Sequence, residues 1–235
     1  MRTITLEGRG PNTMSRAMLE TLDHALDEAN GEPLLLTGAG SSFSAGLDLD
    51  ALAASDATEV KAMLEAMERC TRKLFLYPAP TVAAVNGHAV AGGCLLVQCC
   101  DVRVGTNAAA MRMGMTGVAL GLIYPPFVPA VFRARVPHAE TVLMGAERVG
   151  PRAALELGML DELVPPEGLL ARATERLHAR AHLPREAYAS VKSALREPAY
   201  AHVEKAHARF LKESLASWAA LVPLHRAARA TSKRA

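Results

Sequence analysis

The sequence predicts an α/β fold with a helical C-terminal region, and three features of the chain lead to this prediction. Short apolar runs, typical of buried strands, alternate with longer amphipathic segments through the first two-thirds of the chain. From Pro125 onward the pattern is almost all helical and is punctuated by prolines. With 235 residues, half of them hydrophobic, the chain is long enough to bury one large core.

The hydrophobic pattern also predicts where the individual elements lie. Short apolar runs predict strands at Thr3–Leu6, Leu34–Thr37, Thr81–Val85, Asp101–Val104, Met111–Met113 and Leu160–Val164. Apolar residues at helical spacing predict a helix capped by Ser15 and a long helix from Thr58 to Leu76. Residues 95–99 are expected to form a further apolar helix.

Two glycine-bearing segments, residues 38–49 and 86–94, each follow a predicted strand and lead into a helical pattern. Such a segment can direct backbone N–H groups toward one point from a helix N-terminus. Two sets of N–H groups at one point can hold an oxyanion, as in enzymes that act on acyl groups. The first segment does not fit a dinucleotide-binding fingerprint, because Phe43 stands where the third glycine is required.

Charge and cysteine content argue against several other classes of protein. A net charge of +2 is too small for the strong positive field of a typical nucleic-acid binder, so no nucleic-acid partner is expected. The four cysteines form no CxxC pair and lie mostly in apolar surroundings, which favours buried free thiols over disulfides or metal ligands. No signal peptide, membrane-spanning run or metal site is recognised, and the expected location is cytoplasmic.

The segments Phe43–Leu49 and Asn86–Cys94 resemble the two signature regions of the crotonase superfamily, the enoyl-CoA hydratase/isomerase family. The resemblance extends upstream to Pro11–Met14 and downstream to Cys100–Arg103 and Ala153–Val164. It implies a crotonase-like spiral of ββα turns over residues 1–182. It also implies a helical region over residues 183–235, which in this family contributes to oligomers and covers the active site.

The same resemblance implies a substrate and a site. The substrate is an acyl-CoA thioester, with coenzyme A as part of the substrate and no separate cofactor, and the assembly is a homotrimer or homohexamer. The oxyanion-hole donors are the N–H groups of Leu47 and Gly92. The residues expected to bind substrate around them are Ser44, Ala45, Gly46, Asp48, Gly93, Leu95 and Gly117. Asp48 also has a structural interpretation, as the cap of a short helix at Leu49–Ala53.

The chain departs from the family at the two positions where hydratases carry their catalytic glutamates. Leu95 and Gly117 stand at these positions. Hydration of a double bond needs a base for water and an acid for the α-carbon, and neither side chain supplies one. We therefore expect isomerase-like or atypical chemistry at an enolate. The alternative is a catalytically silent acyl-CoA-binding or scaffold protein with the same fold.

Two other side chains are candidates for acid–base or pocket roles. Glu68 lies at the border of the apolar stripe of its helix; its alternative is a solvated glutamate paired with Arg72 at i+4. Tyr124 stands where relatives place residues of the acyl pocket and can donate a hydrogen bond; its alternative is a packed aromatic at a turn. Cys94 is not expected to act as a nucleophile, because no base is visibly placed beside it.

Overall fold

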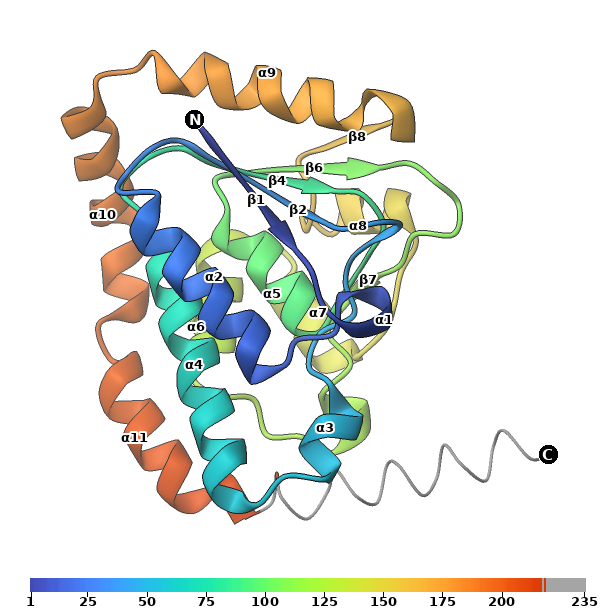
Figure 1. Ribbon diagram of the computed structural model, residues 1–235, viewed down its shortest axis with the longest axis vertical. Helices are drawn as coiled ribbons and strands as arrows, with labels where there is room; N and C mark the ends of the chain where they lie inside the picture. The colour runs from blue at the N-terminus through green and yellow to red at the C-terminus, as the bar shows by residue number, and fades with distance from the viewer. Residues whose placement is uncertain (217, 219–235) are drawn as a thin grey trace.

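The computed structural model describes residues 1–216 and 218, and it confirms the α/β prediction (Figure 1). The strands are β1 (Arg2–Leu6), β2 (Leu34–Gly38), β3 (Ser42–Ser44), β4 (Thr81–Val85), β5 (His88–Val90), β6 (Val102–Thr106), β7 (Met113–Gly114) and β8 (Glu162–Val164). The helices are α1 (Arg9–Asn12), α2 (Arg16–Glu28), α3 (Leu49–Ala53), α4 (Ala57–Phe75), α5 (Gly92–Cys99), α6 (Phe127–Arg135), α7 (Ala139–Gly145), α8 (Pro151–Glu156), α9 (Leu169–Ala181), α10 (Arg185–Tyr200) and α11 (Val203–Glu213). Short 3₁₀ turns lie at Val118–Leu120 and Pro166–Gly168.

The strands form two parallel sheets that the chain visits in alternation. The larger sheet has the order β1-β2-β4-β6-β8, and the smaller has the order β3-β5-β7. The chain passes from β2 to β3, from β4 to β5 and from β6 to β7, and each pair of strands is followed by helical structure. This alternation is the expected spiral of ββα turns. It places the ends of β3 and β5, and therefore both glycine segments, side by side.

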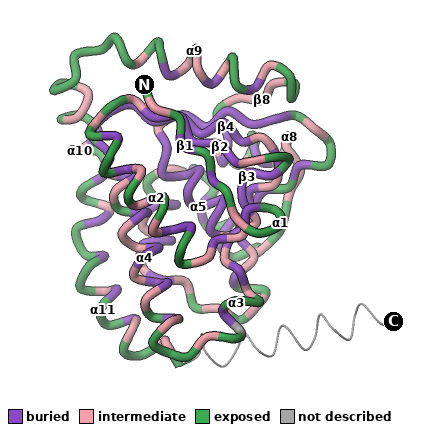
Figure 2. The backbone as a smooth tube through the Cα atoms, viewed as in Figure 1, coloured by how far each residue is buried: buried purple, intermediate pink, exposed green. Residues whose placement is uncertain are grey.

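The larger sheet is buried on both faces, as parallel sheets usually are. Every residue of β2, β4 and β6 is buried (Figure 2). On one face α9 packs against β4, β6 and β2, with Leu169, Ala173 and Leu177 in a small separate core. On the other face the main core is formed with α2, α4 and α5, and α5 is buried along its whole length.

The helix cap predicted at Ser15 is confirmed, but two elements begin at other residues than the sequence predicts. Ser15 caps α2 by accepting a hydrogen bond from the N–H of Met18, 3.2 Å, as expected. The helix α5 begins at Gly92, three residues before the expected start, because the chain turns sharply at Ala91, where φ is +49°. The strand expected at Met111–Met113 forms instead at Met113–Gly114.

All four cysteines are buried and free, which confirms the prediction of structural thiols: Cys70, Cys94, Cys99 and Cys100. Burial raises the pKa of Cys94 to about 12, so its thiol stays protonated and is a poor nucleophile. No helix within residues 1–216 combines the length and apolarity needed to cross a membrane. Residues 217 and 219–235, the end of the expected helical region 183–235, lie outside the described part of the chain.

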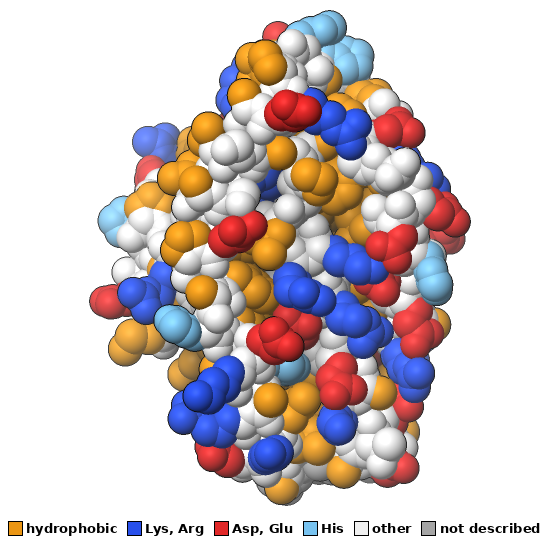
Figure 3. Space-filling view, turned by 90° about the vertical axis from the view of Figure 1, so that its left-hand side faces the viewer, with side chains coloured by type: hydrophobic (Ala, Val, Ile, Leu, Met, Phe, Trp, Pro, Cys, Tyr) orange, Lys and Arg blue, Asp and Glu red, His pale blue; other side chains and the backbone are white. Residues whose placement is uncertain are grey.

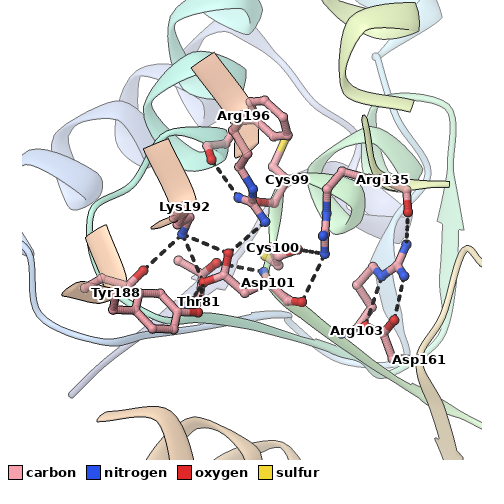
Figure 4. Close-up of polar contacts among 12 residues, drawn as sticks. Thr81, Cys99, Cys100, Asp101, Arg103, Arg135, Asp161, Tyr188, Lys192 and Arg196 are labelled. Atoms are coloured by element: carbon pink, nitrogen blue, oxygen red, sulfur yellow. Dashed lines mark hydrogen bonds and ion pairs between the residues drawn. The ribbon is translucent and has the colours of Figure 1, made fainter. Parts of the chain in front are cut away.

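The C-terminal helix α10 is attached to the core through a buried charge cluster centred on Asp101 (Figure 4). The Asp101 carboxylate pairs with Lys192 at 2.9 Å and Arg196 at 2.7 Å, and accepts the hydroxyl of Tyr188 at 2.8 Å. Burial opposes ionisation of this carboxyl, but the two cations outweigh it and lower the pKa of Asp101. Arg196 also donates to the carbonyl of Cys99, 2.9 Å, at the end of α5.

We predict that Asp101→Asn lowers the free energy of unfolding by about 3 kcal/mol, because it leaves two buried cations without their counter-charge. Urea unfolding followed by circular dichroism measures this change. Glu156→Gln is the matched control: it removes an exposed i,i+4 pair with Arg152 and should have a much smaller effect. Equal effects of the two substitutions would contradict the role given to the Asp101 cluster.

Candidate functional site

The two glycine segments meet where the backbones of Gly46 and Gly92 approach each other. Gly46 has a φ of +83°, and a Cβ on it would lie only 2.7 Å from the carbonyl oxygen of Val90 and 2.9 Å from the nitrogen of Gly92. A Cβ on Gly92 would lie 3.6 Å from the Cα of Gly46. There is no room for a side chain at residue 46, and the two backbones can approach this closely because glycine has none.

The N–H group of Leu47 is oriented by a single parallel β-bridge between Leu47 and Met14. Met14 donates its N–H to the carbonyl of Gly46, 2.8 Å, and accepts the N–H of Asp48, 3.0 Å. In this pairing the N–H of Leu47 itself points away from Met14, and it has no partner among the described residues. Helix α3 begins at Leu49, as expected, so the Leu47 N–H precedes the helix.

The N–H group of Gly92 is the first of helix α5, where no intrahelical acceptor exists. The preceding residue, Ala91, donates its N–H to the carbonyl of Gly114, 2.9 Å, and so fixes the turn that begins the helix. The helix N-terminus carries partial positive charge, which favours an anion at this point. Within residues 1–216 the Gly92 N–H is a second donor without a partner, beside the segment that carries Leu47.

Hydrogen bonds of Ser44 with Asn12 and Gly46 fix the first glycine segment. The Ser44 hydroxyl donates to the carbonyl of Asn12, 2.8 Å, and accepts the N–H of Gly46, 3.2 Å. Ser44 is fully buried, so its side chain positions the turn rather than facing solvent. A Cβ on Gly93 would lie 2.3 Å from the Ser44 carbonyl oxygen, so the glycine permits close packing of α5 on β3. Ala45 is tied to Pro11 by a backbone hydrogen bond of 3.0 Å.

Asp48 has the structural role that its alternative interpretation predicts. Its carboxylate caps α3 by accepting the N–H groups of Asp50 and Ala51, and it pairs with Arg9 at 3.0 Å. Burial acts against ionisation, but the Ala51 N–H and the Arg9 guanidinium overcome it and lower the pKa of Asp48. Because its oxygens are engaged in these contacts, the carboxylate fixes the backbone that follows Leu47.

The two positions that lack the family glutamates are filled in different ways. Leu95, in the first half of α5, has no exposed surface and packs in the main core. Gly117 lies against the ring of Tyr124: a Cβ at residue 117 would be 2.4 Å from Cε1 and 3.1 Å from the hydroxyl oxygen. The phenol therefore occupies the space into which a side chain at position 117 would extend.

The Tyr124 hydroxyl is held by a backbone donor. It accepts the N–H of Gly117 at 2.9 Å. Burial raises the pKa of Tyr124, so the phenol is protonated at neutral pH. The hydroxyl proton has no acceptor among the described residues.

Sequence reasoning missed Met14 as a neighbour of Gly92 and missed the residue that holds the Tyr124 loop. A Cβ on Gly92 would meet the Sδ of Met14 at 2.8 Å and the Cε of Met67 at 3.2 Å, so both methionines lie against this donor. Trp218 is buried and donates its indole N–H to the carbonyl of Ile123, 2.9 Å, directly before Tyr124. No local sequence signal links these residues, which are far apart in the chain.

Glu68 is on α4 and contacts the last residue of α10. Its carboxylate accepts the hydroxyl of Tyr200 at 3.3 Å and pairs with Arg72 at 3.7 Å, the i+4 partner expected from the sequence. Burial raises the pKa of Glu68, and Arg72 partly offsets this effect. These contacts are those of a residue that joins two helices, which favours the structural interpretation.

The described part of the chain shows no second candidate active site. Residues 1–216 contain no group of three or more His, Cys, Asp or Glu side chains placed to hold a metal ion. A cavity of about 550 Å³ lies between α6 and α10 and includes Arg135, Lys192 and Arg196, with none of the residues of the two glycine segments. Val191 and Leu195 of α10 are exposed and line this cavity. Figure 3 views the side of the molecule on which α10 and α11 lie in Figure 1, and it shows hydrophobic side chains among charged ones.

Comparison with known proteins identifies the family. The family model described as enoyl-CoA hydratase/isomerase matches residues 1–217. This chain belongs to the enoyl-CoA hydratase/isomerase family. Its spiral fold and paired sheets are those of solved family members. An enoyl-CoA hydratase from Mycobacterium ulcerans superposes with a TM-score of 0.82, 28% identity and coverage of 89% of this chain and 93% of that one.

Other comparisons match either the fold or part of the sequence. Human mitochondrial delta3-delta2-enoyl-CoA isomerase superposes with a TM-score of 0.89 over 99% of this chain and 95% of that chain, at 22% identity. The short-chain-enoyl-CoA hydratase of Clostridium acetobutylicum is 30% identical over 172 residues, which are 70% of this chain and 65% of that protein. The enoyl-CoA hydratase domain-containing protein 3 of Rattus norvegicus is 34% identical over 74% of this chain and 60% of its own length. The chain thus spans less than two thirds of these curated relatives.

We predict that Gly46→Ala lowers the free energy of unfolding by about 3 kcal/mol or more, because it combines a left-handed backbone with overlap against Val90 and Gly92. Gly40→Ala is the matched control. Gly40 also has a positive φ, +64°, but no atom lies within 4 Å of its added Cβ, so only about 1 kcal/mol is expected. Chemical denaturation compares the two variants, and equal losses would show that the close approach at Gly46 has no cost.

Proposed function

We propose that this chain is an acyl-CoA thioester enzyme that stabilises an enolate between the N–H groups of Leu47 and Gly92. The observation that carries the proposal is the pair of donors without partners on two backbone segments in direct contact. Such donors are placed before the reaction begins, so they need no reorganisation when charge develops on the thioester oxygen. The family membership of the chain supports the thioester as substrate.

The chemistry that we propose at this enolate differs from standard hydration. Leu95 is apolar and fully buried, and the space beside Gly117 is filled by the Tyr124 ring, so neither position provides the acid or base that water addition needs. Isomerisation of an enoyl thioester can use one group that removes a proton from one carbon and returns it to another, so it needs fewer acid–base residues than hydration. Tyr124 is the side chain that we propose to contact the acyl group, because its hydroxyl proton is free to donate.

A catalytically silent acyl-CoA-binding or scaffold protein is the second candidate. The loss of both carboxylate positions favours it. The two free N–H groups favour the enzyme, since a binding protein has no need of donors aimed at a developing charge. For either candidate we propose a homotrimer or homohexamer, for which the exposed Val191 and Leu195 of α10 offer apolar contact area. The cytoplasmic location and the lack of nucleic-acid and membrane partners stay predictions.

The Gly92 donor is tested by a substitution that removes its N–H and a second that keeps it. We predict that Gly92→Pro lowers turnover of the best substrate about 100- to 1000-fold, the cost of losing one oxyanion donor. Proline is accepted at the first residue of a helix. Gly92→Ala keeps the N–H, and its Cβ meets only the flexible ends of Met14 and Met67, so it should retain much more activity.

The assay presents 2-enoyl-, 3-enoyl-, β-ketoacyl- and β-carboxyacyl-CoA thioesters to the purified protein and identifies products by chromatography. Thermal unfolding confirms that each variant is folded. Tight binding of thioesters without turnover of any of them would support the silent binding protein instead. Equal activity of Gly92→Pro and Gly92→Ala would contradict the proposed donor.

We also predict that the native protein hydrates crotonyl-CoA poorly, because Leu95 and Gly117 supply no proton-transfer group. The loss of absorbance of the conjugated thioester measures hydration directly. Hydration at rates of about 10 s⁻¹ or more, ordinary for enzymes, would show that another residue activates water.

A further inference from the structure

The cavity between α6 and α10 carries more positive than negative charge. Four cationic side chains line it: Arg135 of α6, Arg180 of α9, and Lys192 and Arg196 of α10. Asp101 is the only acid among the lining residues that the structure describes. The volume of about 550 Å³ is in the usual range for sites that hold small organic ligands. Both the charge and the size of the cavity therefore suit an organic anion.

Asp101 neutralises only part of this charge. Its carboxylate is shared between Lys192 and Arg196, which are both buried. Arg135 and Arg180 form no ion pair within the described part of the chain. Two guanidinium groups at the cavity are therefore without a counter-charge from residues 1–216.

Arg135 shows most clearly that the charge is unbalanced. One end of its guanidinium donates to the carbonyls of Cys100, 2.9 Å, and Asp101, 3.0 Å (Figure 4), but its Nε is buried without a hydrogen-bond partner among the described residues. Burial and the neighbouring Arg196 lower the pKa of Arg135 to about 10. Burial also lowers the pKa of Lys192 to about 8, although Asp101 acts against it. Both shifts are in the direction expected for cations that lack counter-charge.

The cavity combines these cations with apolar side chains. Leu183, Val191 and Leu195 line it and are half or more exposed, whereas Lys192 and Arg196 are buried. The cavity thus has a cationic floor and an apolar rim. A small polar anion would leave the rim in water, and a neutral apolar ligand would leave the cations without a counter-charge. A carboxylate on an alkyl chain satisfies both, since guanidinium groups bind carboxylates through paired hydrogen bonds and the chain covers apolar surface.

We propose that this cavity binds a free alkyl carboxylate of medium chain length, a fatty acid anion. Arg135 and Arg180 hold the carboxylate, and the chain lies against Leu183, Val191 and Leu195. The cavity shares no lining residue with the proposed oxyanion hole, so this inference does not depend on the proposed function.

The proposed contact between copies of the chain is compatible with this ligand. Such a contact over Val191 and Leu195 would cover the rim of the cavity and take its cations further from water. Cations buried without a partner raise the free energy of the folded protein, so an anion beneath the contact would stabilise the assembly.

The experiment titrates the full chain with octanoate at neutral pH and measures heat of binding. Acetate has the charge without the chain, and octanol has the chain without the charge. We expect octanoate to saturate one site per chain, and each of the other two to bind about tenfold more weakly or less. Octanoate should also raise the temperature of unfolding, because it binds only the folded protein.

The substitution Arg180→Gln tests the cationic floor. It removes one charge and its hydrogen bonds, and we expect it to weaken octanoate binding about tenfold, whereas Arg180→Lys keeps the charge and should retain part of the affinity. Arg133→Gln is the matched control, because Arg133 is an exposed residue of α6 that does not line the cavity. Its affinity for octanoate should equal that of the native protein. Thermal unfolding confirms that each variant is folded.

A second titration, with butyryl-CoA present at saturation, separates this cavity from the thioester site. We expect the affinity for octanoate to be unchanged. Displacement of octanoate by butyryl-CoA would assign it to the thioester site and overturn the inference, as would equal affinities of Arg180→Gln and Arg133→Gln.

Absence of octanoate binding to the native protein would also overturn the inference. Sedimentation then shows what balances the cations. A smaller assembly of Arg180→Gln than of Arg133→Gln would mean that a carboxylate of a second copy of the chain fills the cavity instead. None of these results bears on turnover of thioesters, so the proposed function is tested separately.

Discussion

The structure of the site depends on one contact, the approach of the Gly46 backbone to the Gly92 backbone. Each segment carries one of the two proposed donors, Leu47 or Gly92, so the pair depends on this contact. The contact forms only because residue 46 has no Cβ and adopts a φ of +83°. The β-bridge from Met14 then orients Leu47, and the turn at Ala91 orients Gly92. We propose that together they form one binding point for an oxyanion.

Helix α5 links this contact to the C-terminal region of the fold. Helix α5 begins with the Gly92 donor, and its last residue, Cys99, offers its carbonyl to Arg196 of α10. Arg196 is in turn neutralised by the buried Asp101. The C-terminal helices also reach the other side of the site, where Trp218 bonds to Ile123 beside Tyr124. The C-terminal region therefore supports the site as well as the core.

Much of the fold was predictable from local pattern, because caps and apolar periodicity act over a few residues. Ser15 and Asp48 cap their helices as expected, and the Arg72 partner of Glu68 was given by its i+4 spacing. The contact of Tyr124 with Gly117 was not predictable, since it depends on how a turn folds back on itself. Nor was the orientation of Leu47, which a bridge from Met14 sets across the fold.

The central claim is that Leu47 and Gly92 polarise a thioester carbonyl, and infrared difference spectroscopy tests it most directly. Butyryl-CoA labelled with ¹³C at the carbonyl is bound to the native protein and to Gly92→Pro. The account predicts that the carbonyl stretch moves to lower frequency in the native complex than in water, and that most of this shift is lost in Gly92→Pro. A band at its aqueous frequency in the saturated native complex would contradict the oxyanion hole.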